Sequence, residues 1–413
     1  MAGLVANTPD GHARVHFVAE GEASLHFCIK SGLMDDTLRY GHSVMIVDAG
    51  GGTVDISSYG FNSTAPLVVE EVASPDCLLE GSNILNLRAE KHLRDLLKRS
   101  KYGSKEDIKS MIDYFDRHTK AVFNGGNGPS YIKVGTASCN DPRVNVRRRD
   151  LTLTSTQMLS FFRPSLDRIL TAIKKQLVSG ALGKRIKTVL LVGGFAASPY
   201  LYSALKRGVE DMGLSLYHPE SHTSKAVAQG AMWYFLEHIV SARIMQMTYG
   251  TETVVKYNPK DTQHVERHPT VHNRASGMPV LPKAFSCILK RGTRVHETQE
   301  ISHPCHIEVE DRHELDSVSC AILCYSSMLE NPCWVDVEPR FYKSLCTITA
   351  DTSQVARKAR RGKGGVEFYE QHFKIILLCG LTELEAQISW EEGGIEKRGS
   401  AKLVYDDDLY VPS

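Results

Sequence analysis

The stretch "VMIVDAGGGTVDIS" (residues 44–57) decides how the first half of the chain is interpreted. An apolar run ends at Asp48, three glycines follow, and "TVDISSYGF" alternates as a second strand does. Glycine costs backbone entropy and suits neither a strand nor a helix interior, so three in succession indicate that another group comes close to the backbone. We therefore expect a β-hairpin with glycine at its tip.

The glycine tip is suited to bind phosphate. The backbone N–H groups of Gly50, Gly51 and Gly52 are not shielded by Cβ atoms and can point at phosphate oxygens, and Thr53 adds a hydroxyl donor. Asp48, at the strand end, can hold Mg²⁺ directly or through its water shell. The GK[ST] ending of a P-loop and the GxGxxG fingerprint are both absent, and no helix follows. The alternative is a plain hairpin turn with flanking aspartates.

A second glycine pair lies between a strand and a helix. In "KTVLLVGGFAASPYLYSALKRG" (residues 187–208) a buried strand leads to Gly193 and Gly194. Ser198 and Pro199 then supply an N-cap and a first-turn residue, which predict a helix start. A glycine pair at this position lets a flat ring lie on the backbone.

Helical patterns surround these strands in the first part of the chain. A helix from about residue 82 to residue 100 is predicted with one apolar face: Ile84, Leu87, Leu93 and Leu96. A longer helix follows "TLTST", ends at Gly180 and has apolar residues every three or four positions: Leu159, Phe162, Leu166, Ile169, Ile173 and Leu177. We therefore predict an α/β domain over residues 1–240, and the short β-prone segments that follow predict a β-rich module over residues 241–413.

Composition describes an ordinary globular protein. The 413 residues are 42% hydrophobic and 23% charged, and the net charge of +1 supplies no global field toward nucleic acid or an anionic membrane. Ten cysteines without a CxxC pair, and a start that lacks signal-peptide character, predict reduced thiols and a cytoplasmic location. The apolar runs are far shorter than the roughly 20 residues needed to cross a bilayer. Neither a membrane nor a nucleic acid is the expected partner.

The order of these features resembles the nucleotide-binding domain of the 70-kDa heat-shock proteins, in the actin-like ATPase superfamily with its ribonuclease H-like fold. The glycine-tipped hairpin is similar to that family's second phosphate-binding loop. "LLVGGFAASPYL", with Gly193, Gly194 and Phe195, is similar to its adenosine-binding motif, although Phe195 and Ala197 replace a small polar residue and an arginine. "KAVAQGAMWY" and the closing "ELEAQISWEEGGIEKRGSAKLVYD" resemble the divergent 12-type branch, which is abundant in fungi as well as animals.

The resemblance implies a chaperone-type ATPase that binds ATP or ADP with Mg²⁺ and acts with client or co-chaperone proteins. It assigns Glu20, in "VAEGEASLHFC", to the catalytic glutamate, with Gly21 in place of the usual proline. It assigns Asp48 to catalysis and to Mg²⁺. Lys120, in "KAVF", matches the lysine that contacts the base or ribose of the nucleotide.

The family's first phosphate hairpin, of the form DxGTT, has no match in the sequence. The resemblance therefore implies that mainly lobe II is present, either because the gene model is truncated or because the protein is degenerate. On this interpretation ATP hydrolysis is weak or absent, and "SVMIVDAGG" (residues 43–51) has an unpaired apolar edge that promotes self-association. The alternative function is a non-catalytic nucleotide-binding or scaffold protein that holds partners through its β-rich module.

Two further patterns allow alternative interpretations. His303, Cys305, His306, Cys320, Cys324 and Cys333 are close in sequence and suit zinc, but their spacing is unlike that of a zinc finger and favours buried strand cysteines. "RKARRGKGG", from Arg357, is a basic run that suits nucleic acid or nuclear import, although a solvated loop is the favoured interpretation.

Overall fold

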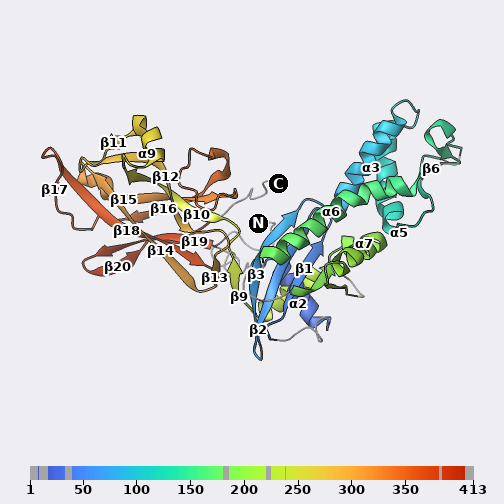
Figure 1. Ribbon diagram of the computed structural model, residues 1–413, viewed down its shortest axis with the longest axis horizontal. Coiled ribbons are helices and arrows are strands. Elements are labelled where there is room, and N and C mark those ends of the chain that lie inside the picture. Colours follow the sequence, from blue (N-terminus) through green and yellow to red (C-terminus); the bar gives the residue numbers. More distant parts are fainter. Residues whose placement is uncertain are drawn as a thin grey trace. The chain divides into compact units, whose positions relative to one another are not determined.

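The computed structural model describes residues 8, 17–32, 40–136, 138–179, 186–219, 225–237, 239–380 and 384–404. The chain divides into two compact units, Met1–Ser241 and Ala242–Ser413 (Figure 1). The first unit combines helices with a large sheet, and the second consists mainly of strands. The protein is therefore a mixed α/β protein with several sheets. Among the described helices, none has both the length and the apolar character that crossing a membrane requires.

The large sheet of the first unit is built around the strand that carries the three glycines. Five neighbouring strands of this sheet, in spatial order, are β3 (Leu67–Leu78), β2 (Val54–Thr64), β1 (Ser43–Ala49), β7 (Ile186–Val192) and β8 (Ser215–Tyr217). β1 pairs antiparallel with β2 on one side and parallel with β7 on the other, and all seven of its residues are buried. The expected unpaired edge at residues 43–51 is therefore wrong, because β2 and β7 occupy both edges of this strand.

Helices cover both faces of this sheet. The helices of the first unit are α2 (Glu20–Lys30), α3 (Ser82–Leu97), α4 (Lys105–Tyr114), α5 (Lys120–Val122), α6 (Ser155–Ser179), α7 (Pro199–Glu210) and α8 (Ala226–Leu236). Side chains of β1 alternate between the faces: Met45 and Val47 join a core with α3, α6 and α7, whereas Val44 and Ile46 join a core with α2 and α8. The period of two along β1 thus separates two helical layers.

The two predicted helices of the first unit are confirmed, with one correction. α6 starts at Ser155, within "TLTST" rather than after it, and extends to Ser179; the expected stop at Gly180 lies outside the described residues. In α3 the buried residues are Leu85, Ala89, Leu93 and Leu97. Leu87, expected on the buried face, is 59% exposed. It lies two positions from Leu85 and Ala89, about 200° around the helix from each, so it points to the opposite side.

Smaller elements complete the first unit. They are the π-helical turn η1 (Phe115–Thr119), the 3₁₀ turns η2 (Pro142–Val144) and η3 (Phe195–Ala197), and a small sheet in the order β4 (Ser130–Lys133), β6 (Asp150–Leu153), β5 (Val146–Arg147). The division between the units falls within β9 (Val240–Ile244).

The second unit has the strands that the sequence predicts, arranged in two antiparallel sheets. One sheet has the order β11 (His272–Asn273), β12 (Pro279–Leu289), β10 (Thr248–Lys256), β15 (Ser317–Tyr325), β16 (Tyr342–Asp351). The other has the order β14 (Gln299–Val309), β18 (Glu367–Cys379), β19 (Leu384–Glu392), β20 (Ile395–Arg398), with β17 (Arg360–Arg361) beside β18 and β21 (Lys402–Leu403) beside β19. The remaining elements are β13 (Arg294–His296), α9 (Thr262–Glu266), η5 (His268–Thr270), η6 (Arg312–Leu315) and η7 (Pro339–Phe341).

One apolar core joins the two sheets of the second unit. Ile322 and Ile348 come from the first sheet, and Ile375 and Ile388 come from the second; all four are fully buried in the same cluster. Two sheets that share one core in this way form a β-sandwich.

Candidate functional site

The three glycines form the tip of the predicted hairpin, and their carbonyl groups turn toward the start of α3. Gly50 N–H donates to the Thr53 carbonyl across the turn at 2.9 Å. The glycine carbonyls accept three bonds from α3: Ser82 N to Gly50 O at 3.1 Å, Asn83 N to Gly51 O at 2.8 Å, and Gly81 N to Gly52 O at 3.2 Å. The first N–H groups of a helix have no partner within the helix, so the glycine loop caps α3.

This capping orients the backbone N–H groups of the loop. In a trans peptide the C=O and the following N–H point in opposite directions. Because the carbonyls of Gly50, Gly51 and Gly52 face α3, the N–H groups of Gly51, Gly52 and Thr53 face away from it. Among the described residues these three N–H groups have no hydrogen-bond acceptor. They form a row of donors on the open side of the tip.

The Thr53 hydroxyl does not belong to this row. Its Oγ1 donates to Asp55 Oδ2 at 2.7 Å, so the side chain expected as a further phosphate donor is engaged within the hairpin. Gly52 is exposed, and a Cβ built there would meet nothing within 4 Å. The tip is therefore open to an approaching group.

The second glycine segment lies directly against the first. Gly193 has φ +91°, and a Cβ built on it would lie 2.4 Å from the Ala49 carbonyl oxygen and 2.5 Å from Asp48 Oδ1. A side chain does not fit at that distance, and the positive φ favours glycine as well. Parallel pairing of Asp48 with Val192 brings the ends of β1 and β7 to the same edge of the sheet. The two glycine segments that the sequence singled out thus meet.

Asp48 is a buried carboxylate at this meeting point. Its side chain accepts a hydrogen bond from Ser24 Oγ at 2.8 Å, and the residue is 6% exposed. Burial raises the pKa of Asp48 to about 6; the Ser24 hydrogen bond opposes this shift, and the charges of Glu20 and Asp55 add to it. At neutral pH the carboxylate is ionised in surroundings that disfavour its charge.

Glu20 lies near Asp48 at the start of α2. It is four residues before Ser24 and therefore on the same helix face as the residue that binds Asp48. Glu20 remains exposed, but its partial burial raises the pKa of its carboxyl group, and the Asp55 charge raises it further. A Cβ at Gly21 would lie 2.2 Å from Ser57 Oγ, which explains why glycine stands where the family resemblance leads us to expect proline.

Lys120 supports α3 through contacts within the protein. Its ammonium group donates to Ser82 O at 3.1 Å, to Asn86 Oδ1 at 3.1 Å and to Asp116 Oδ1 at 2.5 Å. An ammonium group has three N–H donors, so all of them are used. The expected contact with a base or ribose would require the loss of one of these bonds, and in this arrangement Lys120 stabilises the helix start that faces the glycine loop.

Phe195 contributes its side chain to the core below the turn. It is 4% exposed, and its ring centroid lies 6.3 Å from that of Phe162. Gly194 precedes it at the start of η3. Ser198 Oγ then accepts the N–H of Leu201 at 3.4 Å, which confirms the predicted N-cap of α7. The side chain of Phe195 is therefore packed in the core and does not contribute to the candidate site.

The described part of the chain has no group of side chains arranged to bind zinc. No three His, Cys, Asp or Glu side chains there are placed to hold a metal ion. Cys324 is buried on β15, and Cys305 and Cys320 are partly buried beside the sandwich core, as the strand interpretation predicts. Cys333 is exposed, so the interpretation as a buried strand cysteine is wrong for this residue.

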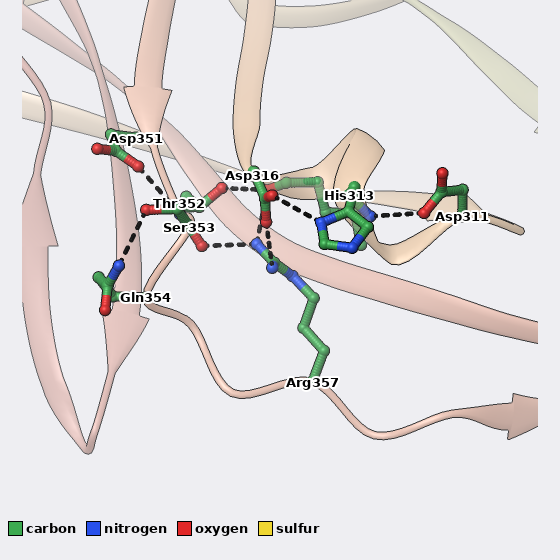
Figure 2. Close-up of polar contacts among 9 residues, drawn as sticks. Asp311, His313, Asp316, Asp351, Thr352, Ser353, Gln354 and Arg357 are labelled. Atoms are coloured by element: carbon green, nitrogen blue, oxygen red, sulfur yellow. Dashed lines mark hydrogen bonds and ion pairs between the residues drawn. The ribbon is translucent and has the colours of Figure 1, made fainter.

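Arg357, at the start of the basic run, is a structural residue (Figure 2). Its guanidinium group donates to Asp316 Oδ1 at 3.2 Å and to the carbonyl oxygens of Leu315 and Thr352, each at 2.6 Å. Its side chain is 6% exposed. Arg357 therefore ties the segment after β16 to η6. The residues that follow it are mostly exposed, but Arg360 and Arg361 form β17, so the interpretation as a solvated loop holds only in part.

Sequence reasoning missed Ser24, Gly81 and Glu80, which position the site residues. A glycine and a serine before the apolar pattern of α3 are a local signal for a helix start, and they point to Gly81. Ser24 and Glu80 act on residues that are distant in the sequence, at Asp48 and on α6, so no local pattern marks them.

No protein-family model matches the sequence, and the search of curated proteins also gives no match. Functional inference for this chain therefore depends on its residues and their geometry.

Proposed function

We propose that the first unit binds an adenine nucleotide together with Mg²⁺, as a nucleotide-binding domain of the 70-kDa heat-shock, actin-like ATPase type. The observation that carries the proposal is the contact of Gly193 with Asp48 and Ala49. It places two glycine segments at the carboxyl ends of the parallel neighbours β1 and β7. Ligands of open α/β sheets bind at such strand ends.

The phosphates would be held by the backbone. The N–H groups of Gly51, Gly52 and Thr53 face away from α3, and successive backbone N–H groups of this kind form anion sites. Glycine at the tip keeps side chains out of the way. This arrangement favours a phosphate site over a plain hairpin turn. A plain turn does not require contacts with a helix that align its N–H groups.

Asp48 would hold Mg²⁺, and the remaining ligands would come from phosphate oxygens and water, as is usual for this ion. Its carboxylate is buried, and Glu20 and Asp55 add negative charge nearby. A divalent cation would offset this charge and lower the raised pKa of Asp48. The electrostatics of the ligand-free site thus suit a cation.

The adenosine would lie against the backbone at Gly193 and Gly194. Hydrolysis is proposed to be weak, because Glu20, which would orient the water, is exposed at the first turn of α2 and bulk water reaches it. The same exposure favours the second candidate function, a nucleotide-binding scaffold without turnover. In either case client or co-chaperone proteins are the proposed partners, with the β-sandwich as the module that holds them.

Calorimetry with Mg·ATP tests the proposed site through Gly51→Val. A Cβ at Gly51 would meet only Asn83 Nδ2, at 3.7 Å, so the valine variant is expected to fold while its side chain blocks the N–H groups. We expect at least about a tenfold loss of affinity, as for removal of well-aligned polar contacts. Gly128→Val is the control, because a Cβ at Gly128 meets nothing within 4 Å.

Equal affinity in wild type and a folded Gly51→Val variant would refute the site. Turnover separates the two candidate functions: multiple-turnover hydrolysis that is lost in Asp48→Ala supports the ATPase, whereas tight binding without turnover supports the scaffold.

A further inference from the structure

Glu80, the residue before Gly81, is the centre of a buried ion-pair network. Its side chain is 3% exposed. Oε2 accepts hydrogen bonds from Arg88 Nη2 and Ser165 Oγ, both at 2.6 Å, and Oε1 pairs with Arg168 Nη1 at 2.8 Å. Both carboxylate oxygens are therefore compensated, as a buried charge requires.

The network joins the start of α3 to α6. Arg88 lies on α3 and also donates, through Nη1, to the Phe161 carbonyl at 2.8 Å and to Ser165 Oγ at 2.7 Å, both on α6. Arg168 lies one turn further along α6. Glu80 itself belongs to the connection between β3 and α3. The connection, α3 and the distant helix α6 are thus held together around one carboxylate.

Gly81, next to Glu80, contacts the glycine loop through its backbone. A Cβ at Gly81 would lie 2.5 Å from Gly51 O and 2.6 Å from Gly52 C, so its backbone rests on the peptide between these residues. The N–H groups of Gly81, Ser82 and Asn83 bind the loop carbonyls. Because each peptide is planar, whatever fixes those carbonyls also fixes the direction of the N–H groups on the other side.

We propose that the network of Glu80, Arg88, Ser165 and Arg168 positions the glycine loop so that its N–H groups face the phosphates, and that it links the loop to α6. This inference rests on the proposed function and names positioning residues for the same site. None of the four side chains contacts the proposed ligand. Arg168, whose side chain is 63% exposed, is the member of the network that faces solvent on α6.

Nucleotide calorimetry with two variants tests the proposal. Arg168→Met removes one exposed partner and is expected to fold, and Glu80→Gln removes the central charge. We expect about tenfold weaker binding of Mg·ATP with unchanged binding of adenosine, in the range typical of outer-shell partners. Arg163→Met is the matched control: Arg163 is exposed on the same helix and forms no ion pair among the described residues.

Hydrogen exchange of the ligand-free protein supplies a readout that does not depend on nucleotide. The amides of Gly81, Ser82 and Asn83 are expected to lose protection in Arg168→Met but not in Arg163→Met. Unchanged protection and unchanged ATP affinity in folded Arg168→Met would overturn the proposal, and so would an equal loss for ATP and adenosine. If wild type binds no ATP, the proposed function fails, and unchanged protection of these amides then overturns the network separately.

Discussion

At the residue scale, burial of the Asp48 carboxylate lowers the stability of the protein at neutral pH. Its folded-state pKa of about 6 lies above the ordinary value of 3.8, so the folded protein binds this proton more tightly than the unfolded chain does. The resulting stabilisation is fully present below about pH 4 and is lost as the pH rises through about 6. At neutral pH the ligand-free protein carries the cost of an ionised, buried carboxylate.

Asp48→Asn is therefore expected to stabilise the ligand-free protein at pH 7.5 by on the order of 2 kcal/mol, because the neutral amide avoids that cost. The asparagine oxygen can still accept the Ser24 hydroxyl. Urea unfolding at pH 7.5 and pH 4.5 measures the difference, which should shrink at the lower pH because wild-type Asp48 is then protonated. A variant that is less stable at pH 7.5, or a difference independent of pH, would contradict this assignment.

Gly193 tests the contact between the two glycine segments. Gly193→Ala places a methyl group against Ala49 O and Asp48 Oδ1, whereas Gly213→Ala has a similar φ of +75° with nothing within 4 Å. Both variants carry the cost of a left-handed backbone, about 1–2 kcal/mol. Overpacking should make Gly193→Ala less stable by a further 1–3 kcal/mol or so, measured by thermal unfolding. Equal losses in the two variants would show that the close approach does not exist.

At the element scale, two glycines fix the position of α2, the helix that carries Glu20 and Ser24. Gly21 lies against β2, and Gly230, on α8, lies against the Ala23 carbonyl, where a Cβ would be 1.7 Å from the oxygen. On the α8 side the contact is with backbone, which cannot move aside as a side chain can, whereas on the β2 side it is with the side chain of Ser57. The packing of α2 between β2 and α8 thereby sets how Ser24 meets Asp48.

Gly230→Ala is expected to destabilise the protein by about 3 kcal/mol or more, because the two helices must separate. Gly208→Ala, on α7, is the control: its Cβ meets only the flexible side chain of Leu170, at 2.7 Å, and alanine gains about 1 kcal/mol of helix propensity. Thermal unfolding of both variants checks the prediction. A Gly230→Ala variant as stable as Gly208→Ala would show that α2 and α8 are not in backbone contact.

The elements also show what the sequence could predict. The hairpin, the N-cap at Ser198 and the extent of α6 follow from local signals such as glycine runs, capping residues and period. The expected burial of Leu87 is wrong. Contacts with the glycine loop and α6, which are distant in the sequence, decide which face of α3 is buried. The sequence could not show that the Lys120 ammonium donates to acceptors on α3 and η1, and its contact with a base or ribose stays a prediction.

At the scale of the whole molecule, the chain consists of two compact units with separate cores. Every residue of the candidate site lies in the first unit, and the core of the second is a closed β-sandwich. A nucleotide at about 100 times its dissociation constant would stabilise the unit that binds it by about 2.7 kcal/mol. Protection of backbone amides from hydrogen exchange on nucleotide binding is therefore expected in the first unit, around the glycine segments.

Hydrogen exchange with and without Mg·ATP measures whether the glycine segments bind the nucleotide. We expect slower exchange in three segments that are distant in the sequence, around residues 50–53, 81–83 and 193–195, with the backbone of β10, β15 and β18 unchanged as the internal control. Loss of the effect in Gly51→Val, but not in Gly128→Val, would tie it to the loop. Protection confined to residues 242–413, or no change at saturating nucleotide, would contradict the account.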